Sequence, residues 1–197
     1  DKGYYEKVLG PEWELFLKAK KSKYFADMAT VRTKGLTQST ALEQDFFLRQ
    51  IPSDEIEIPG IEYGFDSSAL RRRSKELYDF LLVNDNLIVE INSHTDCRGN
   101  DKYNESLAQR RAKSCVDYLI SRGIPKERLS PKGYGEYQPA YHLDKDKNPI
   151  KDANGEKITL TEKFINTLPE GEREEAHQRN RRTAFKVVGQ NFQLESK

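Results

Sequence analysis

The chain has 197 residues, with 33 basic and 32 acidic side chains and a formal net charge of +1. This length leaves room for one domain of ordinary size and a fragment of another, and the balanced charge argues against a nucleic-acid-binding protein. Hydrophobic residues make up 36% of the sequence, so a folded core is expected, and no apolar run approaches the roughly 18 residues of a membrane helix. Asp1 does not begin a secretory signal pattern, so any export signal or lipid anchor is expected upstream.

Residues 1–51 have the pattern of β-structure. Two short segments, 24–33 and 44–51, are rich in aromatic and β-branched residues and are separated by a stretch of Gly, Thr, Ser and Gln. Because a few strands without a helix cannot bury both faces of a sheet, we interpret residues 1–51 as the last strands of an upstream sandwich module. The alternative is that they add strands to the main domain.

An acidic stretch between two prolines, 52–60, is predicted to be a linker. The main domain is then expected over 61–190, followed by a tail at 191–197. It would start with a strand at 61–65 and a helix that begins at 66–68, where Asp and Ser supply capping oxygens, and ends near Val83.

The rest of the main domain alternates strands with helices. The predicted elements are a strand at 87–93, a helix at 101–122, a strand at 129–134 and a strand at 184–188. Before the last strand lies a long polar insertion, 138–180, with a turn signal at 152–155 and a helix from Glu170. This order predicts an α/β fold, a βαβαβ(α)β sandwich with helices packed on a small mixed sheet.

The stretch after the strand at 87–93 combines a carboxylate with a guanidinium. Asp96 lies at the strand end, and the following helix carries Asn104, Leu107 and Arg111 on one face, at offsets of three and four. Asp96 and Arg111 are therefore able to face one cleft. On spacing alone, a plain Asp96–Arg111 salt bridge explains the same pattern.

A longer set of motifs resembles the C-terminal domain of the OmpA family of peptidoglycan-binding proteins. The matching positions are His94-Thr95-Asp96, Gly99, Tyr103-Asn104, Leu107, Arg110-Arg111-Ala112, Val116-Asp117-Tyr118-Leu119-Ile120, Gly123-Ile124, Gly133-Tyr134-Gly135-Glu136 and Asn180-Arg181-Arg182. The resemblance runs from about Ile61 to Val188, and so many positions in the right order make it specific. It implies noncovalent binding of diaminopimelate in the peptide stem of peptidoglycan.

The resemblance also implies roles for single residues. Asp96 would receive the ammonium of the diamino acid and Arg111 its carboxylate, which suits the bidentate geometry of a guanidinium. Asn104 would add amide hydrogen bonds, and Leu107 would pack on the aliphatic stem. The other ligand-binding residues implied are Phe65, Asp66, Ser67, Thr95 and Arg182.

The two cysteines, Cys97 and Cys115, do not form a C-x-x-C pair, so neither a metal site nor a redox motif is indicated. The family resemblance implies an oxidising periplasm, in which thiols on neighbouring segments would be joined. A Cys97–Cys115 disulfide is therefore expected, with two free thiols as the alternative. No cofactor is expected.

Together these features predict a non-catalytic, periplasmic, outer-membrane-associated protein that anchors an assembly to the cell wall and recruits other envelope proteins through an upstream region. The β-rich leader resembles the tail of a carboxypeptidase-regulatory-like sandwich. That pairing is similar to modular lipoproteins of Bacteroidota, including the peptidoglycan-anchoring component of the type IX secretion system. The alternatives are the wall-anchoring domain of a motor stator and a murein-acting enzyme, although the G-x-S-x-G motif of a nucleophile elbow is missing.

Overall fold

The computed structural model describes residues 3–58 and 75–193. Its contacts divide the chain into two compact units, Asp1–Ile51 and Pro52–Lys197, and each is treated by itself. The strand predicted at 61–65 and the helix start at 66–68 lie outside the described residues. Within the described ranges, no helix combines the length and apolarity needed to cross a membrane.

The first unit contains one antiparallel pair of strands, β1 (Glu14–Ala19) and β2 (Asp27–Arg32). β2 falls inside the predicted segment 24–33, but β1 was not predicted. The prediction of a strand at 44–51 is wrong, because in that segment only Gln50 forms a β-bridge, to Tyr24. A strand needs a hydrogen-bonding neighbour, and aromatic content alone does not supply one. Among the described residues of this unit only Thr33 is buried, so the unit closes no hydrophobic core there.

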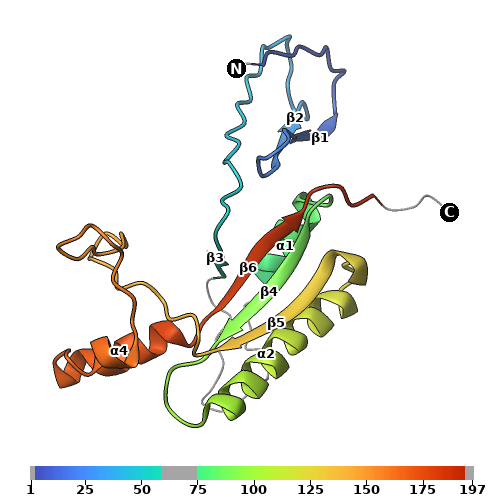
Figure 1. Ribbon diagram of the computed structural model, residues 1–197. Helices are drawn as coiled ribbons and strands as arrows, with labels where there is room; N and C mark the ends of the chain where they lie inside the picture. The colour runs from blue at the N-terminus through green and yellow to red at the C-terminus, as the bar shows by residue number, and fades with distance from the viewer. Residues whose placement is uncertain (1–2, 59–74, 194–197) are drawn as a thin grey trace. The chain divides into compact units, whose positions relative to one another are not determined.

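The second unit is built on a four-stranded mixed sheet (Figure 1). Its strands are β3 (Ile56–Glu57), β4 (Ile88–His94), β5 (Leu129–Gly135) and β6 (Thr183–Gly189), in the spatial order β3-β6-β4-β5. β4 and β5 are parallel, whereas β6 is antiparallel to both β3 and β4. β3 lies in the segment predicted to be a linker, so part of that segment instead extends the sheet along β6.

Two helices described in this unit are α1 (Lys75–Val83) and α2 (Asp101–Ser121). α2 follows closely the helix predicted at 101–122, and α1 ends at Val83, as predicted. The side chain of Asn100 caps α2 by accepting hydrogen bonds from two main-chain N–H groups of its first turn. α2 packs on β5 so closely that a Cβ at Gly133 would lie 2.3 Å from the backbone nitrogen of Gln109. The buried hydrophobic side chains of the strands and helices include Leu77, Leu81, Val89, Ile91, Leu107, Ala108, Ala112, Cys115, Leu119, Ala184 and Phe185.

Arg128, in the short 3₁₀ helix Lys126–Arg128, closes the end of α1. Its guanidinium is buried and donates to the carbonyls of Leu81 (2.9 Å), Asn84 (2.6 Å) and Leu87 (2.9 Å). These carbonyls lie at and beyond the C-terminal end of a helix, where main-chain acceptors lack intrahelical partners. One side chain therefore joins α1, β4 and β5.

The polar insertion at 138–180 is folded. A hairpin with its turn at 152–155, as predicted, leads to α3 (Glu162–Ile165) and to α4 (Glu170–Asn180), which starts where the sequence predicts. The insertion has a small hydrophobic core of its own, composed of Ala140, Leu160, Ile165 and Ala176 with Phe164 and Leu168 packed against it. The amide of Asn180 accepts from Ala140 N–H and donates to the Leu160 carbonyl, both at 2.8 Å.

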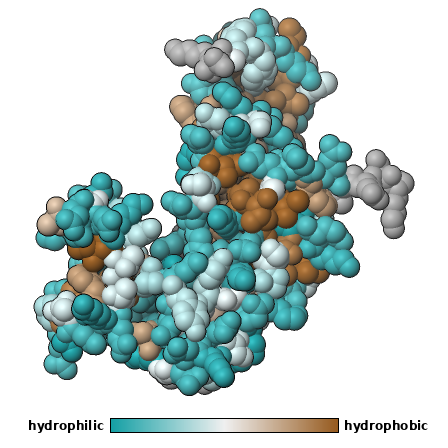
Figure 2. Space-filling view, viewed as in Figure 1, coloured by the Kyte–Doolittle hydropathy of each residue, from teal (hydrophilic) through white to brown (hydrophobic). Residues whose placement is uncertain are grey.

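The predicted α/β fold, with helices packed on a small mixed sheet, is confirmed. Outside the core the visible surface is mainly hydrophilic, as expected for a chain in which 33% of the residues are charged (Figure 2).

Candidate functional site

The loop between β4 and α2 carries the carboxylate predicted to bind ligand. Thr95 N–H donates to the Gly135 carbonyl at 2.9 Å, which ties the start of the loop to the end of β5. Gly99 has a φ of +108°, a conformation that favours glycine, and there the chain turns toward α2. Asp96 is thereby held at the carboxyl ends of two parallel strands with only 4% of its surface exposed.

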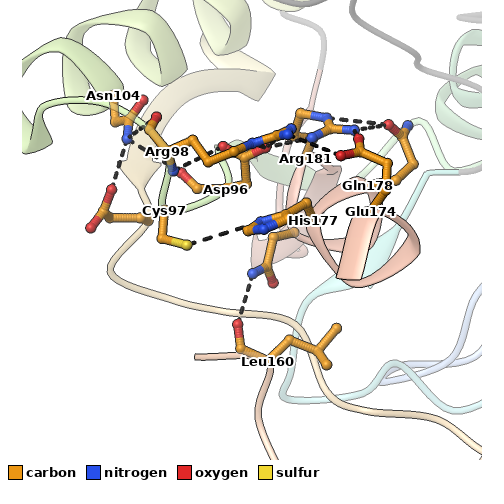
Figure 3. Close-up of polar contacts among 11 residues, drawn as sticks. Asp96, Cys97, Arg98, Asn104, Leu160, Glu174, His177, Gln178 and Arg181 are labelled. Atoms are coloured by element: carbon orange, nitrogen blue, oxygen red, sulfur yellow. Dashed lines mark hydrogen bonds and ion pairs between the residues drawn. The ribbon is translucent and has the colours of Figure 1, made fainter. Parts of the chain in front are cut away.

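Two guanidinium groups neutralise Asp96 (Figure 3). Arg98 donates to its carboxylate from Nε (3.0 Å), from Nη2 (2.7 Å) and from the main-chain N–H (3.1 Å). Arg181, directly after α4, donates through Nη1. Burial alone would raise the pKa of Asp96, but the hydrogen bonds from Arg98 and Arg181 outweigh it and the pKa lies below its ordinary value. The carboxylate is therefore ionised at neutral pH.

Glu174 on α4 holds the same two arginines from the other side. Its Oε2 accepts from Arg98 Nη1 at 2.9 Å, and its Oε1 accepts from Arg181 Nη2 at 2.8 Å. Gln178 accepts a further bond from Arg181 Nε at 3.2 Å. Hydrogen bonds from Arg181 lower the pKa of Glu174 despite some desolvation. Two carboxylates and two guanidinium groups thus form one closed network between the β4–α2 loop and α4.

The residues predicted on one face of α2 are buried together. Asn104, Leu107 and Arg111 are 2%, 5% and 1% exposed. The amide of Asn104 donates to the carbonyls of Asp96 and Arg98 at 3.3 Å and to Glu136 Oε2 at 2.7 Å, so it also fixes the loop. The cations bound to Asp96 are Arg98 and Arg181, so the simple Asp96–Arg111 salt bridge is not what neutralises this carboxylate.

The two arginines that follow Asn180 have different partners, and the ligand-binding role of Arg182 stays a prediction. Arg181 is the member of this pair that reaches Asp96, whereas Arg182 donates to the Gln138 carbonyl at 3.1 Å and lies 3.7 Å from Glu55. Arg181 is the central residue of an inverse γ-turn in which Arg182 N–H donates to the Asn180 carbonyl at 2.9 Å, and the two side chains leave this turn toward different neighbours.

A second buried polar cluster surrounds His94. Glu55 accepts from Asn92 Nδ2 at 2.6 Å and lies 3.1 Å from His94 Nε2, and the imidazole stacks on the Tyr134 ring with 5.3 Å between centroids. Burial lowers the pKa of His94, and the hydrogen bond to Glu55 only partly offsets this. His94 is therefore mainly neutral at neutral pH and serves to join β4 to the segment before β3.

Both cysteines are free, so the predicted disulfide is wrong. Cys115 is fully buried in the core side of α2, and burial raises the pKa of its thiol to about 12. Cys97 instead lies beside α4, with its Sγ 4.0 Å from His177 Nδ1. The two side chains point to different neighbours, although their segments are close in the fold.

Three predicted ligand-binding residues, Phe65, Asp66 and Ser67, lie outside the described residues. Thr95 is buried beside Asp96, and its hydroxyl has no hydrogen-bond partner among the described residues. The sequence interpretation missed Arg98 and Arg181 as partners of Asp96, and Glu174 as the second carboxylate that binds both arginines. The Asp-x-Arg spacing at 96–98 was a local signal for the first, whereas Glu174 lies 76 positions from Arg98 and gave none. Residues 3–58 and 75–193 contain no group of three or more His, Cys, Asp or Glu side chains arranged to hold a metal ion.

Residues 63–153 match the model of the OmpA family. Over these residues the chain is similar to the OmpA family. Outer membrane protein A of Serratia marcescens is 36% identical over 81 residues, which cover 38% of this chain and 22% of that protein. Outer membrane protein A of Escherichia fergusonii is 51% identical over 51 residues, 26% of this chain and 21% of that protein. The chain thus spans about a fifth of the length of these curated relatives.

Solved structures similar to the chain come from several envelope proteins. The peptidoglycan-associated lipoprotein of Burkholderia pseudomallei is 18% identical, with a TM-score of 0.43 over 64% of this chain and 86% of that one. The cell wall anchor of the T6SS of Pseudomonas aeruginosa is 19% identical, with a TM-score of 0.39 over 64% of this chain and 74% of that one. A putative MotB-like protein of Desulfovibrio vulgaris is 20% identical, with a TM-score of 0.43 over 69% of this chain and 72% of that one.

Proposed function

We propose that this chain binds cell-wall peptidoglycan without cleaving it and anchors a periplasmic or outer-membrane assembly to the wall. The match of residues 63–153 to the OmpA family supports the class of ligand. The observation that carries the proposal is the Asp96 carboxylate, which is ionised although it is 4% exposed. A charge held in a largely desolvated position interacts strongly with an opposite charge on a ligand.

The ligand group proposed is the zwitterionic end of diaminopimelate in the peptide stem. Its ammonium would bind Asp96 and its carboxylate would bind Arg111, which α2 carries on its buried face. Leu107, one helical turn before Arg111 on that face, would contact the methylene groups between the two charges. The second carboxylate distinguishes diaminopimelate from lysine, which offers only an ammonium group at this end, so a site with two fixed charges of opposite sign favours diaminopimelate.

Binding without catalysis is supported by the state of the most exposed sulfur nucleophile. Burial raises the pKa of Cys97, and its carboxylate neighbours raise it further. A catalytic thiol needs the opposite shift, because the thiolate is the reactive species. His177, 4.0 Å away, is therefore not the partner of an activated nucleophile.

We further propose a modular envelope lipoprotein, such as the wall-anchoring component of a type IX secretion system. The support is the arrangement of the chain, with a β-rich unit ahead of the OmpA-like domain. In that unit the described strands β1 and β2 close no hydrophobic core, which fits the last strands of a larger sandwich.

Pull-down on purified peptidoglycan sacculi, with free diaminopimelate as competitor, tests the proposal. Asp96→Asn and Arg111→Gln should each weaken binding by about 2–5 kcal/mol, since each leaves one ligand charge unpaired in a desolvated site. Asp117→Asn and Arg110→Gln are matched controls, because both side chains lie on the exposed side of α2. Near-normal binding by both site variants, with native circular dichroism, would refute the site, and release of soluble muropeptides above a buffer control would refute the absence of catalysis.

A further inference from the structure

Three donors crowd one oxygen of the Asp96 carboxylate in this structure. Its Oδ2 accepts Nε and Nη2 of Arg98 and Nη1 of Arg181, whereas its Oδ1 accepts the main-chain N–H of Arg98. A carboxylate oxygen offers about two lone-pair positions, so Oδ2 already holds more donors than it ordinarily accepts. An ammonium group that binds Asp96 through Oδ2 must therefore replace one of these guanidinium donors.

Arg98 is the partner that can leave. Its side chain is 41% exposed and projects from the β4–α2 loop, whereas the Arg181 side chain is 13% exposed. Arg181 follows α4 directly and is held in addition by Gln178. Moving Arg98 breaks side-chain bonds at a partly hydrated site, while moving Arg181 would expose a more deeply buried guanidinium without replacement bonds.

Glu174 offers Arg98 a second position. Arg98 Nη1 already lies 2.9 Å from Glu174 Oε2, and the Glu174 side chain is 65% exposed. When Arg98 releases Asp96, it can keep this ion pair and hydrate its remaining donors. The buried Asp96 is never left without a cation, because the incoming ammonium takes the place of the departing guanidinium.

We propose that Arg98 is a resident counter-ion that the ammonium of the ligand displaces from Asp96, and that Glu174 receives it. The proposal rests on the proposed function, since it specifies how that ligand enters the site. α4 belongs to the insertion at 138–180, so a feature of this chain outside the core sheet sets the affinity of the Asp96 site. Arg98 is thus a competitor of the ligand, and Glu174 is the positioning residue that weakens this competition.

Three variants give a pattern that simple damage to the site would not produce. Arg98→Gln removes the competitor and should tighten binding about three- to tenfold, the range expected for a partly exposed ion pair. Glu174→Gln removes the receiving carboxylate, keeps Arg98 on Asp96 and should weaken binding by a similar factor. The double variant, Arg98→Gln with Glu174→Gln, should bind as tightly as Arg98→Gln alone. Without the Arg98 guanidinium, Glu174 has no displaced group to bind.

The experiment is calorimetric titration of the full chain with meso-diaminopimelate, repeated as a sacculus pull-down, with native circular dichroism required of each variant. Glu175→Gln on the same exposed stretch of α4 and Arg110→Gln are the charge-matched controls, and both should bind like the wild type. If the wild type binds and Asp96→Asn does not, but Arg98→Gln is no tighter than the wild type, the exchange is wrong and the proposed function stands. If Glu174→Gln binds like the wild type, the receiving role is wrong. If the wild type binds neither meso-diaminopimelate nor sacculi, both proposals are overturned.

Discussion

Replacement of Gly133 by alanine tests the contact that places α2 on the sheet. A Cβ at this position would lie 2.3 Å from the nitrogen of Gln109, 2.6 Å from its Cα and 2.8 Å from the carbonyl carbon of Ala108. Non-bonded carbon atoms make favourable contact at about 3.5–4.0 Å, so the two backbones must separate by about 1 Å. All three neighbours are main-chain atoms, and no side-chain rotation can relieve the overlap.

The expected decrease in the free energy of unfolding follows from the packing of α2 on β5, which this separation would disturb. Overpacking a core costs about 1–3 kcal/mol, and we expect about 3 kcal/mol here because a helix backbone, not a side chain, has to move. α2 carries several fully buried side chains, among them Ala112, Cys115 and Leu119. Arg111 is on the same helix, so sacculus binding should fall together with stability.

Urea unfolding followed by circular dichroism measures this cost. Gly171→Ala is the control, because no atom lies within 4 Å of a Cβ at that position, in the first turn of α4. It should leave the free energy of unfolding unchanged or raise it by up to about 1 kcal/mol through helix propensity. A Gly133→Ala protein within about 0.5 kcal/mol of the wild type would show that the α2–β5 contact is looser than described, since exposed substitutions give changes of that size.

Other variants test the buried polar groups. Arg128→Met should lower the free energy of unfolding by about 3–4 kcal/mol, since three main-chain carbonyls lose a charged donor, and a loss under 1 kcal/mol in urea would contradict this. The pKa of His94 is lowered in the folded state from its ordinary 6.5, so the unfolded chain binds a proton at a higher pH than the folded chain does. The free energy of unfolding should therefore decline as the pH falls through about 6.5, until the pKa of the folded state is passed. His94→Gln should remove that part of the pH dependence. It should also reduce the loss of stability in acid that is due to Glu55, because His94 is the first of the partners that lower the Glu55 pKa. Thiol titration without reductant should find both Cys97 and Cys115 reactive in the unfolded protein. In the native protein only Cys97 should react readily. An absence of reactive thiols after unfolding would contradict the finding that both cysteines are free.

The elements that could be predicted from the sequence are those whose signals are local. The helix at 101–122 has apolar spacing, a capping residue before it and Gly123 after it, and α2 runs from Asp101 to Ser121. The strand at 87–93, with the sequence LIVEINS, is a largely apolar run between two predicted helices. The segment 44–51 has equally strong β-type residues but pairs only through the Tyr24–Gln50 bridge, so its composition alone did not decide its structure.

Local sequence signals also predicted only part of the candidate site around Asp96. Helical spacing was sufficient to place Asn104, Leu107 and Arg111 on one buried face of α2. The ion pair between Asp96 and Arg181 joins residues 85 positions apart, and the register of α4 decides whether Arg181 or Arg182 faces the carboxylate. The packing of the insertion sets that register, and no local sequence pattern predicts this packing.

The insertion also determines which partner of Asp96 is fixed. Asn180 ends α4 and is clamped by two buried hydrogen bonds, to Ala140 and Leu160, at the edge of the small hydrophobic core of the insertion. Arg181 is the next residue, so withdrawing it from Asp96 would strain or break bonds that cost about 1–3 kcal/mol each when left unsatisfied. Arg98 comes from a loop in which Asn104 anchors its carbonyl and leaves the guanidinium partly in solvent. The stability of the insertion thus makes Arg181 the permanent partner of Asp96 and leaves exchange to Arg98.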